Sequence, residues 1–286
     1  MKSIQAICLM LAFIVAGSIQ AQESTETLTK QMSFDTNGSE NLLNVYNIEG
    51  SIKIESYSGS VVDITAEKRI RAKNNKDLER GKSEIGMKVE KHGNTIVVYL
   101  RSPNLEYNPK AGKFKHDGDW GDDKYHSSLD FTIKVPQGTN LKLSTINDGD
   151  IVVQDVQANS IRANNINGGI TMENVSGKLQ VNALNRDINI SLASNPHEDC
   201  TFDTLNGDVN LTVQKNPNAD VKFKSLNGDI YTNLATTYLP AETKANKSHG
   251  KHGTKYKIDN NTKFRLGNGG PQWTFNLLNG DVTIKE

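Results

Sequence analysis

The amino-acid sequence predicts an all-β protein, a parallel β-solenoid with rungs of about 20 residues and two irregular insertions. The phrase Leu-Asn-Gly-Asp, followed by Val or Ile, recurs at residues 205–209, 226–230 and 278–282. Apolar residues recur at the same offsets around each copy, and their spacing of two is typical of strands. Aromatic residues make up only 6% of the chain, whereas the frequent Asn-Gly pairs favour tight turns between short strands.

Looser copies of the phrase are centred on Gly50, Gly149, Gly168 and Arg186, so the repeat has seven copies. From position 149 to position 228 the steps are 19, 18, 21 and 21 residues. Each unit therefore contains a strand, an Asn-Gly corner, a second strand and a looser corner, and it buries its apolar face only by stacking on its neighbours. A meander of β-hairpins is the alternative, because Asn-Gly is also a hairpin signal. The solenoid is favoured because the copies align along the whole unit.

The alignment also predicts which side chains form the core. Apolar residues stand seven, five and two positions before the central Gly and two and four positions after it. We therefore expect these side chains to be buried: Leu205, Val209, Phe223, Leu226 and Ile230. Lys222 and Lys224 should point outward.

Two further side chains occupy apolar positions of the register. Cys200 stands where other rungs have Ile, Leu or Val, which predicts a core thiol rather than a nucleophile. Trp273 belongs to the last rung in the sequence, and we expect it to plug the end of the stack.

The corners carry polar residues in register. Their Asn side chains are expected to form a ladder of amides: Asn147, Asn167, Asn185, Asn206, Asn227 and Asn279. The Asp residues that follow Gly suggest calcium, but calcium-binding solenoids use a nine-residue glycine-rich repeat that is absent here, so turn chemistry is favoured. Arg186 replaces Gly, and it would be strained by about 1–2 kcal/mol if this corner required a positive φ.

Residues 1–21 have the pattern of a secretory signal peptide, with Lys2, an apolar run and a small residue at Ala21. Cleavage would remove Cys8 and leave Cys200 alone, so no internal disulfide is expected. No later segment is apolar enough to span a membrane. The 33 basic and 33 acidic residues balance, which argues against nucleic acid as a partner.

The corner phrase and two neighbouring stretches, FTIKVPQGTN and LKLSTINDGDI, carry a family resemblance over about residues 40–286. The sequence resembles the putative-adhesin family of exported bacterial β-strand-repeat proteins, which is related to the head-GIN domains. The resemblance implies a right-handed β-helix-like fold and a surface or envelope location. It supplies no catalytic residues.

These observations predict a domain organisation. Residues 22–40 are expected to form an N-terminal leader or cap, and residues 41–286 a single solenoid domain with insertions at about 66–130 and 240–265. Within the first insertion, residues 74–84 suit a short helix with Leu78 and Ile85 facing the core.

The favoured function is a non-catalytic, adhesin-like binding or structural module at the bacterial envelope, in the periplasm or at the cell surface. A long polar face rich in Asn and Thr suits carbohydrate, cell-wall polymer or another protein. The alternatives are a polysaccharide-processing β-helix enzyme and a calcium-dependent carbohydrate-binding protein. An enzyme is less favoured because the outward positions show no column of carboxylates except the corner Asp residues.

One stretch in the first insertion is a candidate cation site. Residues 117–123 contain four carboxylates: Asp117, Asp119, Asp122 and Asp123. Clustered carboxylates favour hard cations, so weak Ca²⁺ binding is predicted here, with Trp120 presented to a ligand. The spacing departs from the EF-hand pattern, and a solvated loop tip is the alternative. No other cofactor is expected.

Overall fold

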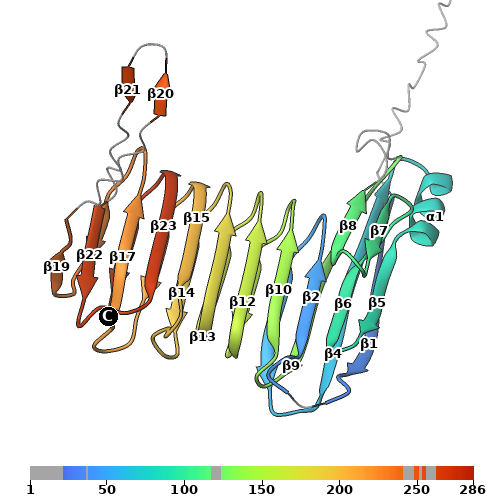
Figure 1. Cartoon of the computed structure of the whole chain (residues 1–286). Coiled ribbons are helices and arrows are strands. Elements are labelled where there is room, and N and C mark those ends of the chain that lie inside the picture. Colours follow the sequence, from blue (N-terminus) through green and yellow to red (C-terminus); the bar gives the residue numbers. More distant parts are fainter. Residues whose placement is uncertain (1–21, 37, 117–123, 241–247, 251–252, 256–261) are drawn as a thin grey trace, which may run out of the picture.

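The computed structural model describes residues 22–36, 38–116, 124–240, 248–250, 253–255 and 262–286. Most of this part of the chain is strand, with one helix, and Figure 1 shows the strands stacked side by side in a long row. The all-β, solenoid-like prediction is confirmed. No helix in the described ranges has the length and apolar character needed to cross a membrane.

The stack has two walls, which we call sheet A and sheet B. In spatial order, sheet A contains β1 (Gln22–Ser33), β4 (Val61–Ala72), β9 (Tyr125–Pro136), β3 (Ile52–Tyr57), β11 (Ile151–Gln154), β13 (Ile170–Ala183), β14 (Ile188–Leu192), β16 (Val209–Thr212), β24 (Val282–Lys285) and β18 (Ile230–Thr232). Sheet B contains β5 (Gly86–His92), β6 (Thr95–Arg101), β2 (Leu42–Tyr46), β10 (Asn140–Thr145), β12 (Gln157–Asn165), the second half of β13, β15 (Cys200–Asn206), β23 (Gln272–Asn279), β17 (Ala219–Lys224), β22 (Thr262–Leu266) and β19 (Thr236–Tyr238).

The central strands are parallel, and equivalent positions of successive repeats pair with each other. In sheet B, Leu141 pairs with Ile161, which pairs with Leu179. In sheet A, Ile151 pairs with Ile170. Each column therefore contains like residues on one face, and the apolar columns of the two sheets form the continuous core.

Antiparallel strands close the first end of the stack (Figure 1). β1 and β4 extend sheet A beyond β9, and β5 extends sheet B beyond β6. The helix α1 (Asn75–Glu84) lies between β4 and β5 in the chain. At the N-terminus of this helix, the Asn74 side chain accepts a hydrogen bond from the backbone N–H of Asp77. Leu78 and Ile85 are buried, which confirms the predicted helix and its inward face.

The last rung of the sequence is not the last rung of the stack. β23 lies between β15 and β17, and β24 lies between β16 and β18. Trp273 is fully buried and pairs with Cys200 on one side and Val221 on the other. The prediction that Trp273 plugs the end of the stack is therefore wrong, because strands with the same register need not pair in chain order.

The predicted core is correct except before the corner. Val209 and Phe223 are buried and Ile230 is half-buried, but Leu205 is 38% exposed and Leu226 is 73% exposed. Cys200 and Phe202 point inward, so strand alternation places Thr204 inside and turns Leu205 outward. Lys224 is exposed, as predicted, and Lys222 is half-buried.

This difference gives a matched pair of substitutions. Phe223→Ala should lower the free energy of unfolding by about 3–5 kcal/mol, since it removes a packed aromatic side chain. Leu226→Ala should change it by less than about 0.5 kcal/mol, because that side chain lies largely in solvent. Urea unfolding of both variants checks the register, and equal losses would contradict it.

Candidate binding site

The corner Asn residues form the predicted ladder. The Nδ2 atom of Asn167 donates to Oδ1 of Asn147 at 2.7 Å, and Asn185 donates to Asn167 at 2.9 Å. The remaining links run from Asn206 to Asn185 (3.2 Å), from Asn279 to Asn206 (2.7 Å) and from Asn227 to Asn279 (2.7 Å). Each amide thus satisfies the next, and the ladder stabilises the stacking of rungs.

The corner Asp residues have a similar structural role. Oδ1 of Asp150 accepts from the backbone N–H of Gly169 at 2.8 Å. Oδ1 of Asp187 accepts from the N–H of Asp208 at 2.9 Å, and Asp208 accepts from Asp281 at the same distance. These carboxylates connect neighbouring rungs, which supports turn chemistry at the corners.

Arg186 is not strained in the way that the alignment suggested. The non-glycine residues with positive φ in the described part are Asp148, Asp155, Asn174 and Asn216, so Arg186 is not among them. The corner glycines Gly149 and Gly168 also lack a positive φ, so a positive φ is not required at every corner. We therefore expect no stabilisation from Arg186→Gly.

The predicted cation residues, Asp117, Asp119, Asp122 and Asp123, and the predicted ligand contact Trp120 lie outside the described residues. Within the described ranges, no three His, Cys, Asp or Glu side chains gather as a metal site.

Calcium binding at residues 117–123 stays a prediction. Calorimetric titration of residues 22–286 should give heat at millimolar Ca²⁺ that an Asp117→Asn/Asp119→Asn variant loses; equal heat from both would contradict it.

The two insertions join the solenoid far apart. The hairpin of β7 (Leu105–Asn108) and β8 (Lys113–His116) packs on the outer face of β2, where Phe114 stacks on Tyr46 with ring centroids 4.2 Å apart. The hairpin of β20 (Ser248–Gly250) and β21 (Gly253–Lys255) follows β19 at the opposite end (Figure 1). The described parts of the insertions therefore do not converge on one groove.

Cys200 is buried, and burial raises the pKa of its thiol to about 11. The backbone N–H of Leu179 lies 3.3 Å from Sγ. The thiol is thus protonated at neutral pH and enclosed in the core, which confirms the predicted core role.

One corner departs from the ladder and gathers charge. Glu49 stands at the corner position where the other rungs have Asn. Its backbone forms an isolated parallel bridge with that of Asn147 in the next rung. Nε2 of His126 lies 3.2 Å from Oε1 of Glu49, and Asp148, the extra residue of its repeat, has a φ of 49°. With Arg69 and Arg71 these groups line a small cavity of about 170 Å³. Cavities for drug-sized ligands are usually about 300–1,000 Å³, so this one is too small for an extended ligand.

Burial raises the pKa of the Glu49 carboxyl above its ordinary value, with His126 opposing the shift and Asp148 adding to it. A carboxyl with a higher pKa in the folded state favours folding at acidic pH, and that contribution is lost as pH rises through its folded pKa.

Glu49→Asn should therefore raise stability at mildly alkaline pH by about 1 kcal/mol, because an amide at this position can hydrogen bond to Asn147 without a buried charge. The gain should shrink at mildly acidic pH. Thermal unfolding at both pH values checks this, with the exposed Glu198→Asn as control. A loss of stability at alkaline pH would contradict the prediction, and it would show that the contact between Glu49 and His126 outweighs both effects.

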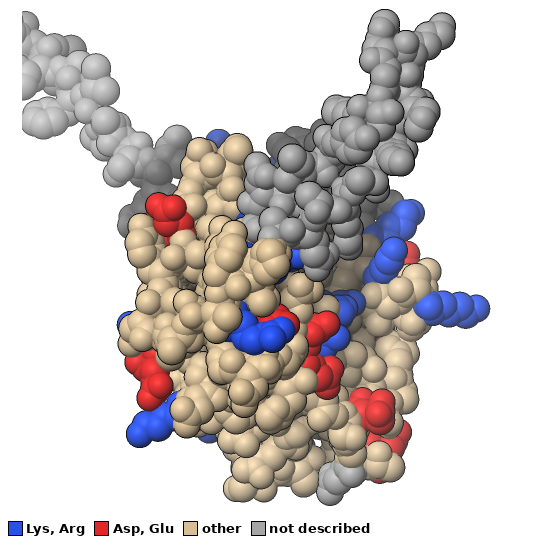
Figure 2. Space-filling model, turned by 60° about the vertical axis from the view of Figure 1, so that its left-hand side comes forward, with Lys and Arg blue, Asp and Glu red and all other residues tan. Residues whose placement is uncertain are grey.

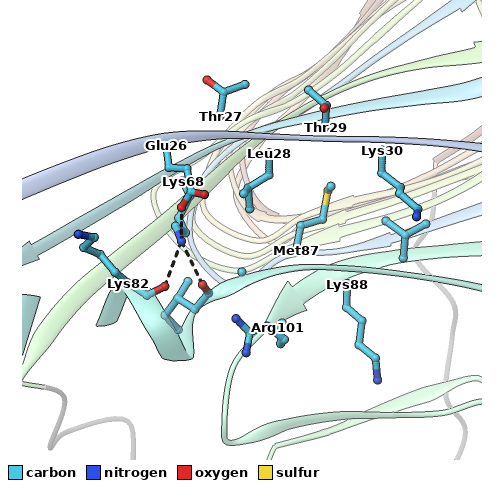
Figure 3. A pocket seen from close by; sticks show the side chains of 13 residues that line it. Glu26, Thr27, Leu28, Thr29, Lys30, Lys68, Lys82, Met87, Lys88 and Arg101 are labelled. Carbon is cyan, nitrogen blue, oxygen red and sulfur yellow. Dashed lines mark hydrogen bonds and ion pairs between the residues drawn. The ribbon is translucent and has the colours of Figure 1, made fainter. Parts of the chain in front are cut away.

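The larger opening lies at the first end of the stack, between the outermost strands of the two sheets. Among the described strands, β1 pairs only with β4 and β5 pairs only with β6, so each has an edge without a described partner. The two edges border a cleft of about 700 Å³. Figure 3 shows Leu28 and Met87 pointing into this cleft from β1 and β5, while Thr27 and Thr29 point away.

A buried lysine forms the inner wall of the cleft. The Lys68 side chain comes from β4 and is 6% exposed. Its ammonium donates to the carbonyl oxygens of Lys82 (3.2 Å) and Ile85 (3.3 Å), at the C-terminal end of α1, and pairs with Glu26 at 2.6 Å (Figure 3). A cation at a helix C-terminus is favourable, so Lys68 fixes α1 against β4 and β1.

Residues 125–266 match the family model described as Toastrack DUF4097. This segment of the chain therefore resembles a Toastrack domain. This match confirms the predicted family resemblance. The matched segment extends from β9 to β22, so the strands and the helix that line the cleft precede it in the sequence.

Two solved structures resemble this chain along most of its length. A putative cell adhesion protein from Clostridium sporogenes is 11% identical, with a TM-score of 0.46, over 92% of this chain and 99% of that one. A putative adhesin from Bacteroides fragilis is 9% identical, with a TM-score of 0.40, over 91% and 96%. No curated protein matches the chain.

Proposed function

We propose that this protein is an exported, non-catalytic, adhesin-like binding module of the bacterial envelope. Its ligand is carbohydrate, cell-wall polymer or an envelope protein. The observation that carries the proposal is the cleft between β1 and β5, an open site with unpaired backbone edges at one end of a rigid stack. The two similar structures are named a putative cell adhesion protein and a putative adhesin, which is consistent with a role in adhesion.

The proposal includes a right-handed solenoid with rungs of about 20 residues. Parallel strands of one sheet are joined by right-handed crossovers in roughly 98% of cases, which supports this handedness. Such a rod presents a long surface of fixed shape, as an adhesion module requires.

A non-catalytic role is supported by the engagement of the repeated carboxylates. Asp150, Asp187 and Asp208 each accept a backbone hydrogen bond from a neighbouring rung, and a catalytic pair would need carboxylates that face a substrate. The thiol of Cys200 is enclosed in the core.

Export is supported by the signal-like residues 1–21. Expression of the full chain in a Gram-negative host should give a mature protein that begins at Gln22 and is recovered from the periplasm or the cell surface. N-terminal sequencing of each cell fraction tests this. A full-length protein confined to the cytoplasm would contradict export.

Binding is tested with the exported protein on glycan arrays and on isolated cell-wall material. Saturable binding to at least one glycan or wall preparation is expected, with no change in the polymer. Release of shortened polymer would instead support a polysaccharide-processing enzyme, and the absence of binding to every preparation would contradict a glycan-directed adhesin.

A further inference from the structure

The cleft between β1 and β5 has an excess of positive charge. The residues that line it include five with cationic side chains and one with a carboxylate, Glu26; the cationic residues are Lys30, Lys68, Lys82, Lys88 and Arg101. Figure 3 shows the Lys88 side chain pointing away from the cleft. At the opposite end of the stack, both signs occur and most of the visible surface is uncharged (Figure 2). The imbalance is therefore a local property of the cleft, since the whole chain has no net charge.

Three of these cations are neutralised by ion pairs. Lys68 pairs with Glu26, Lys82 pairs with Glu79 at 2.8 Å, and Lys88 pairs with Glu90 at 2.6 Å. These pairs fix the walls and leave little charge for a ligand.

Lys30 and Arg101 are the two cations that remain. Among the described residues neither has a carboxylate within ion-pair distance, and the guanidinium of Arg101 is held by the carbonyl oxygen of Ser83 at 3.0 Å. Figure 3 shows Lys30 on β1 and Arg101 across the cleft from it, on the same side of β5 as Lys88 and opposite to Met87. Both are exposed, so a ligand can reach both charges.

We infer that this cleft binds an anionic glycan, a sugar polymer with repeating carboxylate or phosphate groups. This inference rests on the proposed function and names its ligand class. The guanidinium of Arg101 suits the two oxygens of a carboxylate or phosphate, and Lys30 provides a second charge for the next anionic group. Leu28 and Met87 offer apolar surface to sugar rings, and the free strand edges offer N–H and C=O groups to hydroxyls.

An extended peptide fits this cleft less well. Peptides usually bind sheet edges by adding a strand, and lysines on edge strands disfavour such pairing. Here Lys30 and Lys88 stand on the two edges that a peptide would use. A glycan needs no regular strand pairing. The volume of about 700 Å³ lies within the usual range for ligand sites.

The experiment measures binding of the exported protein to four probes by calorimetry. The probes are polygalacturonate for carboxylates, a phosphomannan for phosphates, neutral dextran, and polyglutamate as an acidic peptide. We expect saturable binding to one or both anionic glycan probes, and added salt should weaken it. Binding to dextran and polyglutamate should be at least tenfold weaker. The two anionic probes distinguish carboxylate from phosphate as the group recognised.

A charge-neutral variant locates the site. Lys30→Gln/Arg101→Gln should reduce the affinity for the anionic probe at least tenfold. Lys215→Gln/Lys285→Gln removes the same number of charges from exposed positions away from the cleft. This control variant should change the affinity for the anionic probe less than twofold. Equal loss in both variants would overturn the inference, because it would show a general effect of charge.

The inference and the proposed function can fail separately. If the exported protein binds cell-wall material and the Lys30→Gln/Arg101→Gln variant binds equally well, the cleft is not the site, although the adhesin-like function stands. If the variant aggregates without any change in ligand affinity, Lys30 only protects the free edge of β1 and the inference is overturned. Stronger binding to polyglutamate than to either glycan would also overturn the proposal in favour of an acidic peptide.

Discussion

Deletion of residues 272–286 should unfold the protein or leave it only marginally stable. This segment fills the gap between two other rungs, with β15 and β16 on one side and β17 and β18 on the other. Four of its side chains are fully buried: Trp273, Phe275, Val282 and Ile284. Burial of each is worth about 1.5–3 kcal/mol, so their loss alone removes about 6 kcal/mol or more, a large part of the 5–15 kcal/mol typical of a folded domain.

Urea unfolding and circular dichroism of the truncated chain test this expectation. A deletion of equal length at the free N-terminal edge, residues 22–36, is the control, because β1 is mostly exposed and pairs on one side only. A truncated chain that melts within a few degrees of the full chain would contradict the prediction. It would show that β17 can pair directly with β15, since both strands share one register.

The solenoid could be predicted because the same spacing of apolar residues around the corner occurs in seven copies. The positions two and four residues after the corner Gly lie inward in sheet A, and those five and seven residues before it lie inward in sheet B. The error at Leu205 and Leu226 was avoidable, since strict alternation from Phe202 leads to Thr204 and not to Leu205. The order of the rungs was not predictable, because equal registers permit several pairings.

The charged corner also had a signal in the sequence. Glu49 interrupts the Asn column and Asp148 is an extra residue in the next copy, so both departures from the repeat meet at one place. The cleft had no such signal. Lys30, Lys68 and Arg101 come from strands outside the repeat, and their proximity depends on antiparallel pairings that local patterns do not specify.

Gly280→Ala should be among the most damaging single-residue changes at the corners, with a loss of about 3 kcal/mol or more. A Cβ at this position would lie 2.0 Å from the carbonyl oxygen of Gly207, and backbone in the neighbouring rung has no flexible end that can move aside. The φ of 137° adds strain for any L-residue. Overpacking typically costs about 1–3 kcal/mol and the backbone conformation about 1–2 kcal/mol, so the two together exceed most surface substitutions.

Gly93→Ala separates these two contributions. Gly93 also has a positive φ, of 59°, but a Cβ there would meet no atom within 4 Å, so only the conformational cost of about 1–2 kcal/mol should appear. Chemical denaturation of both variants gives the difference, which measures how tightly the rungs stack. Similar losses in the two variants would mean that the rungs separate easily at the corner, and that the amide ladder through Asn206, Asn279 and Asn227 holds them less firmly than its short hydrogen bonds indicate.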